Sequence, residues 1–474
     1  MRAALALVML AGFFVIAVGA TVFLGGLAFV VYERGDVGSA AWLGALTVVV
    51  GGPSLYAMVR ALWARPRPSG VPVTREAHPE LWRHVDELAR LAGTRSPDDI
   101  RLVDSANAGV WERYGVRYLE LGLPFVAGMT IGELRSVLAH ELGHYGGGHT
   151  QVSTVTFRAK LALGLMIEQG GYLSAVLYGW ARLYALVAAS ESRKHERFAD
   201  EVSVAAAGRE ATTRSLLRGG PIGEGWNDYL RWYVSLAVIA GRTPPLLQGF
   251  RAYLDHPRRV HQLRELEPLM AAQEPTSVFD SHPPIRERVA AIARVSPLSG
   301  GVTEAVDERL AWTLLDGMAP EAVAALAGVG GPPIEWEQLA GLTGPVLVRR
   351  YADALRHAGR VSKIGETLAD VLAALERGEL HELTGRPVDG SLSTAEVHEA
   401  AVETVTELLA CAVADQLVTA NRALLELNWG GMFVLRLPDG AAVYPDDLVA
   451  PAVRDANRVS EVRLRLQSIG VDGL

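Results

Sequence analysis

Two histidines and a glutamate have residue types and a spacing that could hold a metal ion and activate water. The stretch Ile131–His149 contains HELGH, which runs from His140 to His144. On a helix, residues four apart leave the same face one turn apart, so both histidines can direct a ring nitrogen at one zinc ion. Glu141 lies beside them, where its carboxylate can act as a base without binding the metal.

The surrounding sequence predicts the helix that this spacing requires. Thr130 is a suitable N-cap residue and Glu133 follows it by three positions, which is the capping-box pattern. Apolar residues recur along one face at Ile131, Leu134, Val137, Leu138 and Leu142. Glycines at positions 146–148 weaken or end the helix.

A polar segment, Ser190–Asp200, supplies the third protein ligand that a catalytic zinc needs. Glu196 would complete a set of two histidines and one glutamate. Asp200 lies four residues further on the same helical face, where it could accept a hydrogen bond from a ligand histidine and fix its tautomer. His195 is a rival ligand by type but points to a different face. The alternative for the whole segment is a solvated, charged helix.

Three motifs in this order resemble peptidase family M48, a family of membrane zinc metallopeptidases that includes HtpX-type and CAAX-prenyl proteases. They are HELGH, then SRKHERFAD about fifty residues later, then Ser281-His282-Pro283-Pro284 with Arg288 beyond it. The resemblance runs from about residue 70 to about residue 295. It implies a gluzincin fold, one catalytic zinc per chain, and endopeptidase activity on membrane or misfolded proteins.

The resemblance also implies roles outside the zinc ligands. His282 and Arg288 would hold the substrate backbone or stabilise the tetrahedral oxyanion. Asn107, Ala108 and Gly109 occupy the place of the substrate-side edge strand, although the family more usually has an aromatic residue where this chain has Gly109. The alternatives are a salt-bridging role for Arg288 and a purely structural strand.

Composition restricts the class of protein. The net charge of −8 argues against a nucleic-acid partner. The single cysteine, Cys411, excludes an intramolecular disulfide and a cysteine-ligated zinc cluster. Half of the residues are hydrophobic and the mean hydropathy is +0.18, values that favour the presence of membrane spans.

Two uncharged runs near the N-terminus predict a transmembrane hairpin. Ala3–Tyr32 and Val37–Val59 contain no charged residue, and about twenty apolar residues suffice to cross a bilayer. Basic residues gather beyond the second run, at Arg60, Arg65 and Arg67. The positive-inside rule therefore predicts a multi-pass protein of the plasma or inner membrane with its catalytic part on the cytoplasmic side.

The predicted fold is that of a mainly α membrane protein in three parts. Residues 1–63 form the transmembrane hairpin. Residues 64–298 form the zinc protease domain, with a small β-sheet and a candidate second membrane hairpin at 152–190. Residues 299–474 form a mostly helical accessory domain that is a candidate binding site for a regulatory partner. Its expected elements are helices at Ala305–Leu326, Val346–Arg377 and Ala395–Leu427, and a β-hairpin at Gly430–Tyr444.

These observations together predict a membrane-anchored zinc metalloendopeptidase. Its substrate would be a protein or peptide, hydrolysed by zinc-activated water with Glu141 as the general base. Two alternatives remain open. One is a membrane scaffold or signalling protein with a gluzincin fold that does not cut, and the other is a zinc hydrolase of a non-peptide amide.

Overall fold

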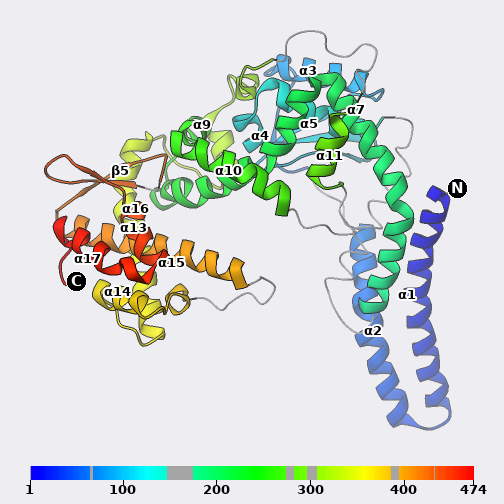
Figure 1. Cartoon of the computed structure of the whole chain (residues 1–474). Coiled ribbons are helices and arrows are strands. Elements are labelled where there is room, and N and C mark those ends of the chain that lie inside the picture. Colours follow the sequence, from blue (N-terminus) through cyan, green and yellow to red (C-terminus); the bar gives the residue numbers. More distant parts are fainter. Residues whose placement is uncertain are drawn as a thin grey trace. The chain divides into compact units, whose positions relative to one another are not determined.

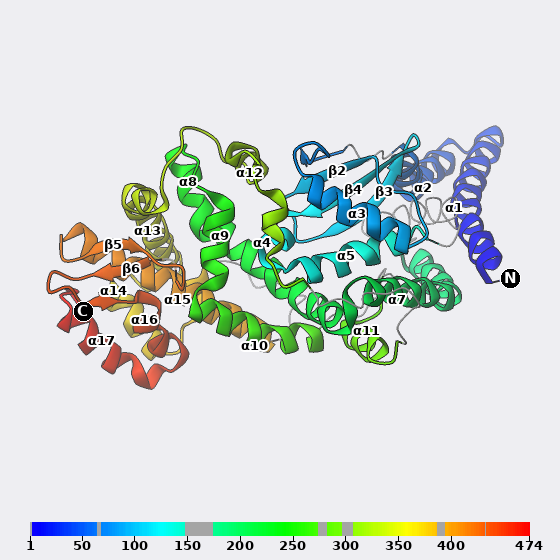
Figure 2. The ribbon, with the colours of Figure 1, turned by 90° about the horizontal axis from the view of Figure 1, so that it is seen from above.

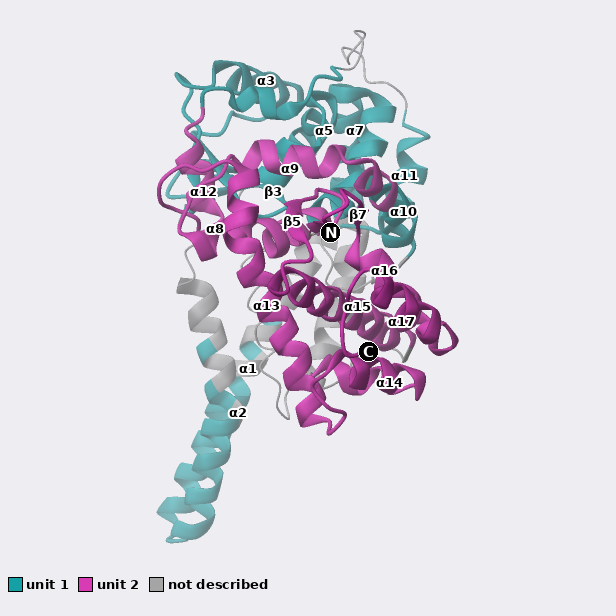
Figure 3. Cartoon of the chain, turned by 90° about the vertical axis from the view of Figure 1, so that its left-hand side faces the viewer, with its two compact units in different colours: residues 1–223, 263–317 teal, residues 224–262, 318–474 magenta. Residues whose placement is uncertain are grey.

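The computed structural model describes residues 2–63, 68–146, 174–273, 282–295, 307–385, 394–431 and 433–474. These parts are mainly helical and include two small sheets (Figure 1). They divide into two compact units, coloured in Figure 3: residues 1–223 with 263–317, and residues 224–262 with 318–474. The second unit thus includes residues 224–262, which the sequence analysis placed with the protease domain. The three-part division remains a prediction.

The N-terminal region is a pair of long helices, α1 (Arg2–Glu33) and α2 (Val37–Trp63), which pack against each other (Figure 1). A close approach at Gly51 brings the helices together, because a Cβ there would lie 2.4 Å from the side chain of Thr21. Over the described residues, no helix meets the length and hydropathy required of a membrane span. The helices lie where the sequence predicts them, and their crossing of a membrane remains a prediction.

The sheet of the first unit has the strand order β1-β2-β4-β3 (Figure 2). Strands β2 and β4 run parallel, whereas β3 runs antiparallel to β4 and forms one edge. The alternation of the strand sequences places Ile100, Leu102, Leu119 and Leu121 in the core. The strand bounds are Val71–Pro72 (β1), Asp99–Val103 (β2), Ala108–Arg113 (β3) and Val116–Gly122 (β4).

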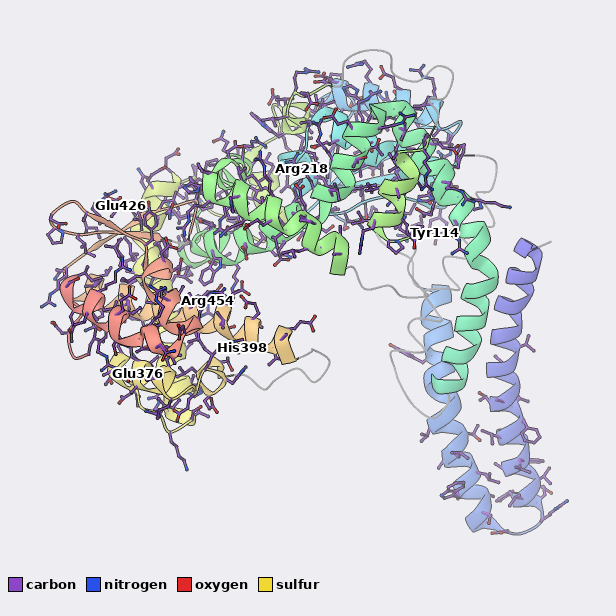
Figure 4. The ribbon with its side chains drawn as sticks, viewed as in Figure 1. Tyr114, Arg218, Glu376, His398, Glu426 and Arg454 are labelled. Atoms are coloured by element: carbon purple, nitrogen blue, oxygen red, sulfur yellow. The ribbon has the colours of Figure 1, made fainter. Side chains whose placement is uncertain are left out.

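Strands β3 and β4 form a hairpin that turns at Tyr114 and Gly115. Both residues have positive φ, at 53° and 82°, which is the pattern of the two-residue turns that match strand twist. Tyr114 is labelled in Figure 4, at the tip of this hairpin. The edge strand predicted from Asn107-Ala108-Gly109 is therefore present as a strand, since β3 begins at Ala108.

Helices α3 and α5 pack against each other, and α5 also contacts the edge strand β3. The predicted N-terminus of α5 is confirmed: the Thr130 hydroxyl accepts a hydrogen bond from the Glu133 backbone N–H, and the Glu133 carboxylate accepts one from the Thr130 backbone N–H. The helices of the first unit outside the N-terminal pair are α3 (Pro79–Leu91), α4 (Leu123–Gly128), α5 (Ile131–Gly143), α7 (from Ser174), α11 (Ile285–Ile292) and the 3₁₀ helix η2 (Ala311–Leu315).

Helix α7 runs from Ser174 to Tyr229 with one internal break at Gly208, where φ is 78° and ψ is 163°. The helix continues through Gly219, Gly220 and Pro221. Packing explains this: buried Ile222 contacts Gly128 of α4 and retains the helix where local propensity opposes it. Residues 147–173 lie outside the described residues, so the membrane hairpin at 152–190 remains a prediction.

An aromatic cluster forms the core of the second unit. Four aromatic residues at helical spacing, Trp226, Tyr229, Trp232 and Tyr233, are buried and belong to this core. It lies on the end of α7 and on the π-helix η1 (Leu230–Val234). Further helices are α8 (Ser235–Ala240), α9 (Leu246–Asp255), α10 (Pro257–Gln273, which continues into the first unit), α12 (Pro320–Leu326), α13 (Trp336–Val361), α14 (Leu368–Glu376), α15 (Thr394–Thr419), α16 (Pro445–Arg454) and α17 (Val459–Ser468).

The second unit also contains an antiparallel sheet in the order β5-β6-β7. The predicted C-terminal hairpin is confirmed by β6 (Phe433–Arg436) and β7 (Ala442–Val443). The helix predicted to extend to Leu427 ends at Thr419, and β5 (Leu424–Leu427) follows. The reason is local: Asn421 adopts φ of 53°, which ends the helix, and the next residues pair with β6.

Candidate metal centre

The candidate metal centre lies where α5 approaches α7, and a glycine makes this approach close. A Cβ on Gly143 would lie 2.9 Å from the Cα of Ala199, a backbone atom that cannot rotate away. Near the same contact, the Ser203 hydroxyl donates to the Ser136 carbonyl at 3.0 Å. The helix that carries HELGH is therefore held directly against the segment that carries Glu196.

Four side chains could hold a metal ion here: His140, His144, Glu196 and His282. One candidate ligand atom from each lies within 4.8 Å of every other. The Nε2 atoms of His140 and His144 are 3.1 Å apart, and each lies 3.6 Å from a Glu196 carboxylate oxygen. Among the described residues, no other group of three or more His, Cys, Asp or Glu side chains has its candidate ligand atoms this close together.

These distances fit a zinc ion. Two nitrogens at 2.0–2.1 Å from a tetrahedral zinc lie about 3.3 Å from each other, close to the separation of the two Nε2 atoms. Two imidazoles and one carboxylate also form a donor set that zinc accepts. The residues predicted from the sequence as ligands, His140, His144 and Glu196, are thus brought together from helices α5 and α7.

Burial sets the protonation of the two histidines on α5. It lowers the pKa of His140 to about 4 and that of His144 to about 3. Both rings are therefore neutral at neutral pH, and a neutral imidazole is the form that binds a metal. Burial acts on Glu141 in the opposite sense and raises its pKa to about 7.

Asp200 and Arg288 contact His140 on its Nδ1 side, away from the candidate metal position. The Nδ1 atom of His140 lies 3.1 Å from the Asp200 carboxylate, and the Arg288 guanidinium donates to the same carboxylate at 2.6 Å. With the His140 proton on Nδ1 and bonded to Asp200, Nε2 is left free to bind a metal. These contacts suit the role predicted for Asp200. They also match the salt-bridging alternative for Arg288, whose guanidinium bonds to Asp200 and also lies 3.0 Å from His140 Nδ1.

His282 lies at the accessible side of this cluster, with 39% of its side chain exposed. Its Nδ1 lies 2.9 Å from Glu196 Oε2. Burial lowers the pKa of His282, but the hydrogen bond to Glu196 and the charge of that carboxylate outweigh it and raise the pKa overall. The family resemblance implied substrate or oxyanion contact for His282, and its place among the candidate ligands was not predicted from the sequence. The signal that could have identified it as a candidate ligand is that it is a histidine inside one of the three motifs.

A second contact fixes the other end of α5, and the sequence analysis missed it. The Glu133 carboxylate is fully buried and accepts two hydrogen bonds of 2.8 Å from Arg218 on α7. Arg218 also donates to the Gly128 carbonyl at 3.0 Å, and Arg214 lies 3.5 Å from Glu133 (Figure 4 labels Arg218). Helix α7 therefore contacts α5 at both ends, near Glu133 and near His144.

The edge strand has room beside it at Gly109. A Cβ at this position would meet no atom of the described residues within 4 Å, and the backbone has no positive φ that requires glycine. Ala108 is buried, and the Asn107 carbonyl accepts from the Gly122 N–H at 2.8 Å. Asn107, Ala108 and Gly109 thus lie at one end of the sheet edge, and their contact with a substrate remains a prediction.

Comparison with known proteins agrees with these motifs. Residues 76–296 match peptidase family M48. The Protease HtpX homolog 1 of Sulfurisphaera tokodaii is 32% identical over 122 residues, which cover 24% of this chain and 37% of that protein. The chain therefore spans little more than a third of the length of this relative. No solved structure matches the chain significantly. The resemblance found in the motifs is confirmed, since the residues that match the M48 family model contain all three motifs.

Proposed function

We propose that this chain is a zinc metalloendopeptidase that is anchored in a membrane and cleaves protein or peptide substrates. The observation that carries the proposal is the cluster of His140, His144 and Glu196, with Glu141 next to the first ligand on the same helix. A site used only for structure has no need of a carboxylate base at that position. Membership of a peptidase family supports the same chemistry.

His140, His144 and Glu196 would hold the zinc, and the bound ion would polarise the scissile carbonyl and lower the pKa of water toward ~7. Glu141 accepts the proton of the attacking water and delivers it to the leaving amine. His282, which is exposed at the cluster, donates to the oxygen on which negative charge develops. Arg288 acts through Asp200 and keeps His140 in its metal-binding tautomer.

The membrane anchor belongs to the same proposal. Helices α1 and α2 contain the two uncharged runs, and the basic residues that follow the second run favour a cytoplasmic peptidase part by the positive-inside rule. Proteins that lie in or near the membrane, or that have unfolded there, are then the substrates within reach. Fractionation of cells, followed by carbonate extraction of the membranes, tests the anchor independently of activity.

The decisive experiment compares casein cleavage by the full-length, detergent-purified protein and by its Glu141→Gln variant, both loaded with zinc. We expect cleavage by the wild type and a loss of at least about a hundredfold in the variant, because general-base catalysis contributes roughly 10²–10⁴-fold. Zinc content should be equal in both. Glu210→Gln is a suitable control, since this side chain is 82% exposed on α7.

Each outcome has a distinct meaning. Equal cleavage by wild type and Glu141→Gln would contradict the role of the base. No cleavage of casein by zinc-loaded wild type would contradict the peptidase proposal and favour the scaffold or the non-peptide hydrolase. Loss of zinc from Glu141→Gln would mean that Glu141 is a ligand.

A further inference from the structure

The pairing of β3 fixes which of its main-chain groups face outward. The Gly122 N–H donates to the Asn107 carbonyl, so these two residues form a hydrogen-bonded pair at the end of the β3–β4 ladder. In an antiparallel ladder such pairs alternate with pairs that do not bond. Ala108, Val110 and Glu112 therefore direct their N–H and C=O groups away from β4. Because β3 is the edge of the sheet, these groups face a side on which none of the described strands pairs with it.

One of these outward-facing groups is bonded to the metal helix. The Tyr145 hydroxyl donates to the Val110 carbonyl at 2.7 Å. Tyr145 immediately follows the candidate ligand His144, at the end of α5. The contact therefore joins the edge of the sheet to the chain one residue beyond a candidate zinc ligand.

The ring of Tyr145 is itself held in place. The Arg117 guanidinium lies 4.9 Å from the centre of the ring, a cation–π arrangement. Arg117 is 3% exposed, and it donates to the Thr94 hydroxyl at 2.9 Å and to the Arg95 carbonyl at 2.7 Å. Because these bonds fix the Arg117 guanidinium, they also fix the position of the Tyr145 ring that it contacts. The Tyr145 hydroxyl can therefore hold β3 in place through the Val110 carbonyl.

We propose that Tyr145 is a positioning residue that sets the distance between the edge of β3 and the metal ligands. The inference rests on the proposed peptidase function. A peptide that adds to a sheet edge is placed by main-chain hydrogen bonds, so the position of the edge determines where the scissile bond lies. Tyr145 occupies one lone pair of the Val110 carbonyl and leaves the main-chain groups of Ala108 and Glu112 for the substrate.

The test uses Tyr145→Phe, which removes the donor and keeps the ring over which Arg117 lies. Tyr118→Phe is the matched control, because Tyr118 is on the same sheet and its ring stacks on Trp111 at 4.4 Å, a contact that phenylalanine preserves. Both are made in the full-length protein. The readouts are kcat and KM for a fluorogenic peptide taken from a casein site that the wild type cuts, zinc content, and hydrogen exchange of residues 105–116.

We expect Tyr145→Phe to lower kcat at least about tenfold with a smaller change in KM, since misplacement of a bound substrate reduces the rate. Zinc content should stay at the wild-type level, and amides of β3 should exchange faster. Tyr118→Phe should remain within about twofold of wild type, as expected for a change that breaks no bond to the strand.

Unchanged kcat and unchanged exchange in Tyr145→Phe would overturn the positioning role while leaving the peptidase proposal intact. An equal loss in both variants would also overturn it, because the effect would then come from the sheet in general. Faster exchange in Tyr145→Phe, in a protein whose wild type cuts nothing, would support the contact and contradict the peptidase function.

Discussion

Asp200 in the first unit and Asp446 in the second are both shielded from water, yet their pKa values shift in opposite directions. Burial raises the pKa of Asp200, but hydrogen bonds to His140 and Arg288 outweigh it and lower the pKa. For Asp446, burial and repulsion by Asp447 raise the pKa to about 6 despite nearby arginines. A direct cationic partner therefore decides whether a shielded carboxylate remains charged.

Two carboxylates around the candidate metal centre have a direct cationic partner of this kind. Glu133 bonds to Arg218, and Asp200 bonds to Arg288. These pairs fix the two helices at the site and the ring of a candidate ligand. The difference teaches that carboxylates bonded to arginines hold the geometry of the first unit, whereas burial and the neighbouring Asp447 raise the pKa of Asp446.

Removing Arg218, the partner of Glu133, should have the largest effect. The buried Glu133 carboxylate would then keep only the more distant Arg214, at 3.5 Å, as a cationic partner. We expect Arg218→Met to lower the free energy of unfolding by about 2–4 kcal/mol, measured by chemical denaturation. Arg251→Met is the control, since its partner Asp255 is exposed and such pairs contribute about 0–1 kcal/mol. Equal losses in the two variants would show that the burial of Glu133 does not matter.

Removing the partner of Asp200 should affect the metal more than the fold. We expect Arg288→Met to weaken zinc binding about 10–100-fold, as is typical when a group behind a ligand histidine is lost. Competition with a zinc-binding dye measures this. Arg286→Met, which changes an exposed residue of the same helix, should leave zinc affinity unchanged. Undiminished affinity in Arg288→Met, with lost activity, would instead favour the substrate role that the family resemblance implies.

The smallest effect is expected from pH at Asp446. Between its ordinary pKa of 3.8 and the folded value of about 6, the native state keeps a proton that the unfolded chain has released. The free energy of unfolding should therefore fall as pH rises from about 4 to about 6, by about 1–2 kcal/mol. Urea denaturation followed by tryptophan fluorescence measures it. Asp446→Asn should remove this part of the pH dependence, and an unchanged slope would assign it to other groups.

Features that depend on neighbouring residues could be predicted from the sequence. The capping box of Thr130 and Glu133, the helix of HELGH and the C-terminal hairpin each depend on residues a few positions apart. The three candidate zinc ligands were predicted from motif spacing, and the structure brings them together. The bond from Tyr145 to Val110 could not be predicted, because it joins residues that only the fold makes neighbours.

The errors have the same origin. Local propensity for helix is worst at Gly219-Gly220-Pro221, yet the helix continues there and breaks at Gly208. Burial of Ile222 against α4 decides between the two, and the sequence does not show that contact. Likewise, Leu424–Leu427 is apolar enough for either a helix or a strand, and pairing with β6 makes it a strand.

The close approach at Gly143 has a consequence for recognising such enzymes by pattern. The metal motif is usually written with any residue allowed at the two central positions. Here the second of them, Gly143, faces the backbone of Ala199, and any larger residue would push the two helices apart. A search that demands a glycine at this place would therefore select chains in which a carboxylate from a neighbouring helix can come within reach of the same ion.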